Sequence, residues 1–194
     1  EIIDFTNPAA RDWWFSKRQY LFSELGIDGM KTDGGEHLWG SGLTAHDGQK
    51  GASLVNTYAR EYSRAYHDFV QAGTGGDGLI FSRAGYTGAQ TSPAHWAGDE
   101  NSTWEAYRAS IRAGLTAGIA GISVWGWDLG GFSGEVPTHE LYLRGTAMAA
   151  LCPVMQYHSE SHGSQDNRER TPWNIAERTG EAQVLDLYRE FAKL

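Results

Sequence analysis

The sequence predicts an α/β protein built around a parallel sheet. Segments with helical spacing of apolar residues alternate with short apolar runs along the 194 residues, and this alternation is typical of parallel α/β architecture. Five of the short runs end near a charged or imidazole side chain, and in such folds the C-terminal ends of the strands carry the chemistry. Gly (25 residues) and Trp (8 residues) are both frequent, which suits loops that approach a ligand closely and offer it flat rings.

The predicted helices rest on apolar side chains at helical spacing and on residues that stop a helix. The clearest apolar stripe covers residues 52–72 and ends at Gly73, because glycine commonly terminates a helix. A later helix that begins near Trp104 would be capped by Ser102 or Thr103. The expected helices are residues 11–25, residues 52–72, the stretch from Trp104 to a stop at Gly118, residues 139–150 and residues 182–194.

Five short apolar runs are predicted to be strands, and a polar loop is expected at residues 159–174. Five strands are too few to close an eight-stranded α/β barrel, which indicates a piece of a longer enzyme. The strands are expected at residues 26–33, 79–82, 94–96, 119–127 and 152–155, and the polar residues at or after their ends are Asp33, Arg83, Asp99, Asp128 and His158.

Composition and charge exclude several classes of function. The formal net charge is -8, which argues against a nucleic-acid partner, and no apolar run approaches the roughly 20 residues that cross a bilayer. The single Cys152 excludes an internal disulfide and a multi-cysteine metal site, and it is compatible with the cytoplasmic location that we expect. No metal or organic cofactor is expected, because the Gly-rich stretch 73–78 lacks the lysine of a phosphate loop and because His158 and His162 do not follow the zincin order. The oligomeric state stays open.

Asp33 and Asp99 are the candidate catalytic carboxylates. Asp33 precedes two glycines, so it is either an exposed carboxylate with room for a substrate or a loop residue that caps a turn. Asp99 is either an acid favoured by a helix N-terminus or a general acid whose protonated form is favoured by the nearby ring of Trp96. Two carboxylates on neighbouring strand ends make a glycosidase pair reasonable, since one would attack the anomeric carbon while the other protonates the leaving oxygen.

Three further strand-end residues are candidates for binding a sugar. Arg83 and His158 would hydrogen-bond hydroxyl groups; alternatively, Arg83 forms a structural ion pair and His158 is a satisfied buried imidazole. Asp128, which lies between Trp127 and a Leu-Gly-Gly-Phe run, would accept two hydroxyl hydrogen bonds or would simply close a turn. The expected partner is therefore an oligosaccharide or a small glycoside.

Six motifs, in order along nearly the whole chain, resemble those of glycoside hydrolase family 31, the α-glucosidases and α-xylosidases. One such motif would be weak, whereas six in order with plausible spacing are a strong resemblance. The motifs are Asp4-Phe5-Thr6-Asn7-Pro8 with Trp13-Trp14, Lys31-Thr32-Asp33-Gly34-Gly35-Glu36, Ser82-Arg83-Ala84-Gly85, His95-Trp96-Ala97-Gly98-Asp99, Trp127-Asp128-Leu129-Gly130-Gly131-Phe132 and Pro153-Val154-Met155-Gln156-Tyr157-His158.

The resemblance implies a retaining exo-α-glycosidase with Asp33 as the nucleophile and Asp99 as the acid/base. It also implies a (β/α)8 TIM barrel, of which residues 1–194 would form one partial catalytic domain with about strands four to eight. The first strands and the flanking β domains would lie outside the chain, and the isolated chain is expected to be inactive. The subsite for the non-reducing-end sugar would be lined by Arg83, Trp96, Asp128 and His158.

One departure from the family pattern bears on the substrate. Many α-glucosidases of the family have Trp two residues before the nucleophile, whereas this chain has Lys31. Lys31 resembles the α-xylosidase branch and some α-glucosyltransferases, and it would alter the pocket around the C5 substituent of the sugar. The residues thus lean toward α-xylosides over α-glucosides. Two alternatives remain: a transglycosylase that uses the same covalent intermediate, and a non-catalytic carbohydrate-binding protein.

Overall fold

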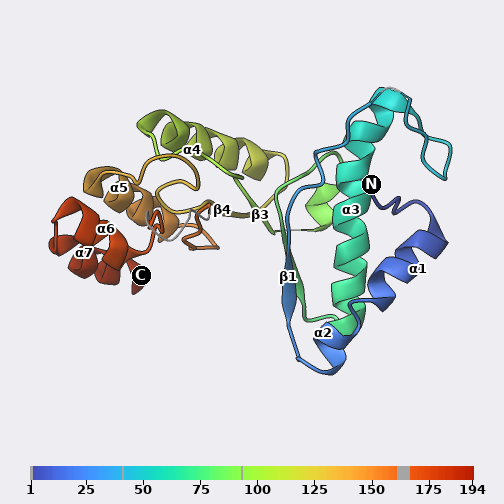
Figure 1. The fold of residues 1–194 in the computed structure, drawn as a ribbon, viewed down its shortest axis with the longest axis horizontal. Helices are drawn as coiled ribbons and strands as arrows, with labels where there is room; N and C mark the ends of the chain where they lie inside the picture. Colours follow the sequence, from blue (N-terminus) through green and yellow to red (C-terminus); the bar gives the residue numbers. More distant parts are fainter. Residues whose placement is uncertain (1, 41, 93, 161–166) are drawn as a thin grey trace. The chain divides into compact units, whose positions relative to one another are not determined.

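Helices alternate with short strands in the computed structural model, which describes residues 2–40, 42–92, 94–160 and 167–194 (Figure 1). The strands form a sheet in the order β1-β2-β3-β4, and the parallel pairing of β1 with β2 and of β2 with β3 agrees with the parallel α/β architecture that the sequence predicts. The chain divides into two compact units, residues 1–95 and 96–194. The elements are α1 (Pro8–Ser16), α2 (Tyr20–Ser23), β1 (Gly29–Thr32), α3 (Gly51–Thr74), β2 (Leu79–Ser82), the 3₁₀ turn η1 (Ala89–Thr91), β3 (Ala94–Trp96), α4 (Trp104–Ile119), β4 (Val124–Gly126), α5 (His139–Ala149), α6 (Pro172–Thr179) and α7 (Gln183–Ala192).

The first unit is a parallel sheet edge covered by the long helix α3. β1 pairs with β2 in parallel, with Met30 opposite Ile80, and β2 pairs with β3 in parallel. Met30 and Ile80 pack into a core with Tyr66 and Val70 of α3 and with Phe15 of α1. Because side chains alternate along a strand, Lys31 lies on the face of β1 that points away from this core. β1 ends at Thr32, directly before the candidate catalytic residue Asp33.

The first predicted helix, residues 11–25, is wrong as one element, because the structure divides it into α1 and α2. α1 begins earlier than expected: the side chain of Asn7 accepts hydrogen bonds from the N–H groups of Ala9 and Ala10, and Pro8 occupies the first turn. Both residue types are favoured at these positions. A helix start set by capping is invisible to a search based on apolar spacing.

α3 continues past its predicted stop. Gly73 lies inside the helix, and Gly75 ends it in the left-handed conformation (φ 68°). A Cβ on Gly73 would lie 2.5 Å from the ring of Phe22. Gly73 therefore serves the close approach of α2 to α3, and the glycine that terminates the helix is two residues later.

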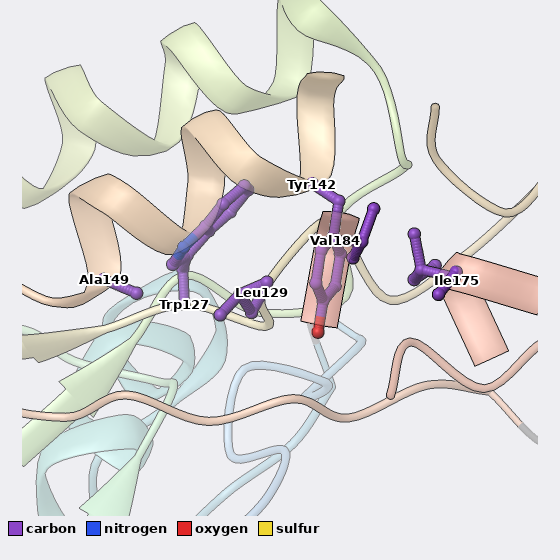
Figure 2. Packing of buried hydrophobic residues seen from close by; sticks show 7 residues of the cluster. Trp127, Leu129, Tyr142, Ala149, Ile175 and Val184 are labelled. Carbon is purple, nitrogen blue, oxygen red and sulfur yellow. The ribbon is translucent and has the colours of Figure 1, made fainter. Parts of the chain in front are cut away.

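The second unit packs helices around the end of β4. Its core contains Trp127, Leu129 and Tyr142, with Ile175 and Val184 from α6 and α7 (Figure 2). The predicted cap of α4 is confirmed, and it is Thr103, whose hydroxyl accepts a hydrogen bond from the N–H of Ala106. α4 extends one residue beyond Gly118, whereas α5 and α7 end within two residues of their predicted bounds.

Two sequence predictions in this unit are wrong. The expected strand at residues 152–155 is replaced by a single parallel bridge between Asp128 and Gln156; Pro153 has no N–H to give to a ladder. The expected loop at residues 159–174 runs into α6, which begins at Pro172 behind the cap residue Thr171, while residues 161–166 lie outside the described ranges. β1 and β4 are also shorter than predicted. None of the described helices is long and apolar enough to span a membrane.

Candidate functional site

Asp33 is an exposed carboxylate on a tightly built turn directly after β1. Its side chain is 58% exposed, and its backbone carbonyl accepts a 2.7 Å hydrogen bond from the hydroxyl of Tyr62 on α3. The next residues, Gly34 and Gly35, have positive φ angles of 74° and 94°. A Cβ on Gly35 would lie 2.8 Å from the Tyr62 ring, so this turn requires glycine. Burial, reinforced by the neighbouring tyrosines, Asp33 and Glu36, raises the pKa of Tyr62, which keeps its hydroxyl a donor.

Arg83, at the end of β2, reaches Asp33 and a second carboxylate. Its Nη1 lies 3.3 Å from Asp33 Oδ1, and its Nε lies 2.7 Å from Glu36 Oε1. His37 contacts both partners, with its Nε2 3.2 Å from Glu36 Oε1 and 3.1 Å from Arg83 Nη2. The Arg83 side chain is only 15% exposed. Arg83 therefore forms ion pairs in this structure, and one of them is with the candidate nucleophile.

Lys31 is exposed on β1, and its ammonium group lies over the ring of Phe81 on β2. Its Nζ lies 5.9 Å from the ring centroid, and Phe81 is its register partner on β2. Lys31 is the second-last residue of β1, and Asp33 follows the strand directly. A cation thus stands two residues before the candidate nucleophile.

A cavity of about 310 Å³ in the first unit does not resemble a reaction centre. Its lining is largely apolar and includes Leu38, Trp39 and Leu54. Its one carboxylate, Asp4, accepts hydrogen bonds from Thr6 and from the N–H of His46. Bonds of this kind fix a loop, and the candidate nucleophile Asp33 does not line this cavity.

Asp99 lies on a loop between β3 and α4 in the second unit. Trp96 is almost fully buried, whereas Asp99 is exposed. Gly98 before it has a positive φ of 94°, and Glu100 after it turns its side chain inward to the hydroxyl of Ser110. Burial raises the pKa of Glu100, and the hydrogen bond from Ser110 opposes that shift. The two neighbouring acids thus have different environments, because Asp99 is exposed and Glu100 is half-buried.

Asp128 and His158 occupy the loops that follow β4 and the bridge at Gln156. Asp128 is 1% exposed, and its Oδ1 accepts a 2.9 Å hydrogen bond from Nε2 of Gln156. His158 is exposed and packs edge-on against Phe132, with ring centroids 5.1 Å apart. The buried-imidazole interpretation of His158 is therefore wrong. The Asp128 side chain is thus tied to the segment at Gln156, and its backbone carbonyl accepts a 2.8 Å hydrogen bond from the N–H of Gly131.

Sequence reasoning missed three residues that organise these clusters. Glu36 and His37 surround Arg83 as described, and Glu36 belongs to a recognised motif without having been given a role. Arg170 is buried at 1% exposure in a stretch predicted to be a polar loop. Its one sequence signal is its place directly before Thr171-Pro172, a pattern that starts a helix. Within the described ranges, no group of three or more His, Cys, Asp or Glu side chains forms a set able to hold a metal ion.

Comparison with known proteins gives a consistent match. The family model for the "Glycosyl hydrolases family 31 TIM-barrel domain" matches residues 1–194. The chain is 52% identical over 192 residues to a 1,3-alpha-isomaltosidase of Kribbella flavida, and the aligned region covers 98% of this chain but 26% of that protein. It is 48% identical to an isomaltosyltransferase of Sporosarcina globispora (98% and 17% covered) and 38% identical to an alpha-xylosidase of Emericella nidulans (91% and 22% covered).

The structural comparison agrees. A cycloalternan-degrading enzyme from Trueperella pyogenes in complex with a covalent intermediate superposes with a TM-score of 0.92 at 52% identity, covering 98% of this chain and 26% of that one. The same enzyme has been solved in complex with isomaltose. The chain therefore spans about a quarter or less of the length of these proteins.

Proposed function

The chain belongs to glycosyl hydrolase family 31, and on that premise we propose that it carries the catalytic residues of a retaining exo-α-glycosidase. The single observation that carries this proposal is the exposed Asp33 carboxylate at the end of β1, held beside the Arg83 guanidinium at 3.3 Å. The covalent intermediate seen in the Trueperella enzyme supports a double displacement.

In the proposed reaction, Asp33 attacks the anomeric carbon while Asp99 gives a proton to the departing glycosidic oxygen. The glycosidic bond breaks, and an ester forms between the sugar and Asp33. Asp99 then removes a proton from water, which displaces Asp33 and restores both carboxyl groups. Asp99 is exposed on the loop between β3 and α4, so a substrate can reach it. We propose that the sugar subsite is lined by Arg83, Trp96, Asp128, His158 and Lys31.

The proposed substrates are α-glucosides, including those that release or transfer an isomaltosyl unit. The support is the ranking of relatives: proteins named for isomaltosyl chemistry are 52% and 48% identical, whereas the alpha-xylosidase is 38% identical. This ranking outweighs the lean toward α-xylosides from Lys31, because Lys31 is one position and the identities extend over almost the whole chain.

Transfer to a sugar hydroxyl is the second candidate function. The 48% identity with an isomaltosyltransferase favours it, and it differs from hydrolysis only in the acceptor that displaces Asp33. Product analysis at rising acceptor concentration separates the two: hydrolysis releases free sugar throughout, whereas transfer gives longer products at the expense of free sugar.

The test uses single substitutions in the protein that carries this chain. Asp33→Ala is expected to abolish turnover of both a 4-nitrophenyl α-glucoside and isomaltose. Asp99→Ala is expected to lose about 10²–10⁴-fold on isomaltose and much less on the aryl substrate, since only a poor leaving group needs the proton. Asp28→Ala is the matched control, because Asp28 is exposed at the opposite end of β1. Substantial turnover by Asp33→Ala would refute the nucleophile, and binding without turnover by the wild type would favour a non-catalytic protein.

A further inference from the structure

We propose that Arg170 is a positioning residue that holds the Asp99 loop in register for proton transfer. This inference rests on the proposed function, because that proposal makes Asp99 the acid/base. The starting observation is a guanidinium buried at 1% exposure whose hydrogen-bond acceptors lie on segments far apart in the sequence.

The contacts of Arg170 join three segments of the second unit. Its Nη2 donates to the Ser102 hydroxyl at 3.1 Å, to the Gly134 carbonyl at 2.9 Å and to the Glu135 carbonyl at 3.3 Å. Its Nη1 donates to the Arg168 carbonyl at 2.6 Å. Ser102 lies in the loop after β3, and residues 134 and 135 lie in the loop after β4. One side chain thus ties both strand-end loops to the segment that precedes α6.

Backbone hydrogen bonds extend this connection to Glu100, the residue directly after Asp99. The Glu100 carbonyl accepts hydrogen bonds from the N–H groups of Phe132 (2.7 Å) and Ser133 (2.9 Å), and the N–H of Ser102 donates to the Ser133 carbonyl at 3.2 Å. A Cβ on Gly131 would lie 2.8 Å from the Ser102 backbone. The two loops are therefore in direct contact, and Arg170 bonds to both of them at once.

Asp99 lies between two held segments of its loop. On the side of β3, Gly98 has a φ of 94°, which few other residues adopt, and the Ala97 N–H donates to the Gly126 carbonyl at 3.2 Å. On the other side, the loop is held through Glu100 and Ser102, and this is the side that Arg170 supports. Since a displacement of about 1 Å at a reacting group can cost about 10²-fold in rate, loss of the support is expected to appear in the proton-transfer step.

The backbone of Arg170 is hydrogen-bonded to the core of the second unit, which fixes the point from which its side chain reaches the two loops. The Tyr142 hydroxyl donates to the Arg170 carbonyl at 2.8 Å in a buried contact, and Tyr142 lies within the cluster of Figure 2. Burial lowers the pKa of Arg170, while the nearby Glu160 opposes that shift. Burying a cation costs free energy, and an apolar side chain in place of Arg170 would avoid that cost. An apolar side chain could not, however, donate hydrogen bonds to the loops at Ser102 and Gly134.

The experiment measures kcat/KM for a series of aryl α-glucosides of increasing leaving-group pKa. The variants are Arg170→Lys, Arg170→Gln and Ser102→Ala, with Asp99→Ala as the reference. Arg178→Gln is the matched control, because Arg178 donates from an exposed position to the Asn167 carbonyl of the same segment. The ratio of kcat/KM between poor and good leaving groups does not depend on the fraction of correctly folded protein.

The expected result is a selective loss on poor leaving groups. Arg170→Gln should lower the ratio by about tenfold or more, Arg170→Lys and Ser102→Ala should lower it less, and Arg178→Gln should leave it within about twofold of the wild type. An unchanged ratio in the Arg170 and Ser102 variants, with a lowered ratio in Asp99→Ala, would overturn the inference and leave the proposed function standing. An unchanged ratio in Asp99→Ala itself would overturn the acid/base assignment and this inference with it.

Discussion

Glu36 holds Arg83 in position beside Asp33, and the substitution Glu36→Gln tests that role with little change in shape. Glutamine keeps the size of the side chain and one acceptor oxygen, but it removes the charge that faces Arg83 Nε at 2.7 Å. With Glu36 neutral, the guanidinium retains Asp33, at 3.3 Å, as its charged neighbour. Arg83 is then expected to turn toward Asp33 and away from the sugar hydroxyls that it is proposed to bind.

The magnitude follows from the partial exposure of the pair. A fully exposed ion pair contributes about 0–1 kcal/mol, and a hydrogen bond to a charged group contributes about 1.5–3 kcal/mol. The Arg83 side chain is 15% exposed and that of Glu36 is 40% exposed, so the pair lies between these cases. We expect a loss of about 1–2 kcal/mol in transition-state stabilisation, which is about a 5–30-fold fall in kcat/KM.

The assay compares Glu36→Gln with Glu61→Gln on an aryl α-glucoside, together with urea unfolding of each variant. Glu61 is a matched control because its Oε1 lies 2.7 Å from Arg60 Nη2 in an ion pair of similar exposure on α3. Glu61→Gln should leave kcat/KM within about twofold, and both variants should unfold within about 1 kcal/mol of the wild type. Equal effects of the two substitutions on kcat/KM would refute the role assigned to Glu36.

Two predictions concern stability. Gly73→Ala should lower the free energy of unfolding by about 1–3 kcal/mol, because its Cβ would meet the Phe22 ring, whereas the same change at an exposed helix position would add about 1 kcal/mol; a rise in the urea midpoint would contradict the packing. Burial lowers the pKa of His95, so its neutral form adds stability above the unfolded pKa of about 6.5, and this stability is lost as the pH falls toward the folded pKa. His95→Gln should therefore lose less stability than the wild type between about pH 7 and pH 5, and an equal or larger loss would show that His95 does not carry this dependence.

The features predicted well from sequence are those set by local residue patterns. β2 and β3 fall at the expected residues, and the capping of α4 by Thr103 follows from a side-chain type at a helix start. The strand-end rule located Asp33, Arg83 and Asp99 on the loops or termini that the structure gives them. These features depend on neighbours a few residues apart, which a sequence displays directly.

The features missed from sequence depend on contacts between distant residues. Gly73 looks like a helix stop, and only the approach of Phe22 shows that it is a packing position. Arg170 lies in a polar stretch, and its burial arises from acceptors more than thirty residues away in the loops near Ser102 and Gly134. Residues 152–155 are apolar and were expected to form a strand, but no strand forms there. Pro153 has no N–H to donate to a neighbouring strand.

The measurement that tests the central claim most directly is covalent trapping at Asp33. The protein that carries this chain is treated with a ring-fluorinated α-glucosyl fluoride, whose glycosyl-enzyme forms faster than water removes it. Peptide mass mapping should then find one added fluoroglucosyl group on the peptide that contains Asp33, and the Asp33→Ala variant should carry none. A stable label on a different carboxylate, or turnover by the Asp33→Ala variant at the wild-type rate, would contradict the assignment of Asp33 as the nucleophile.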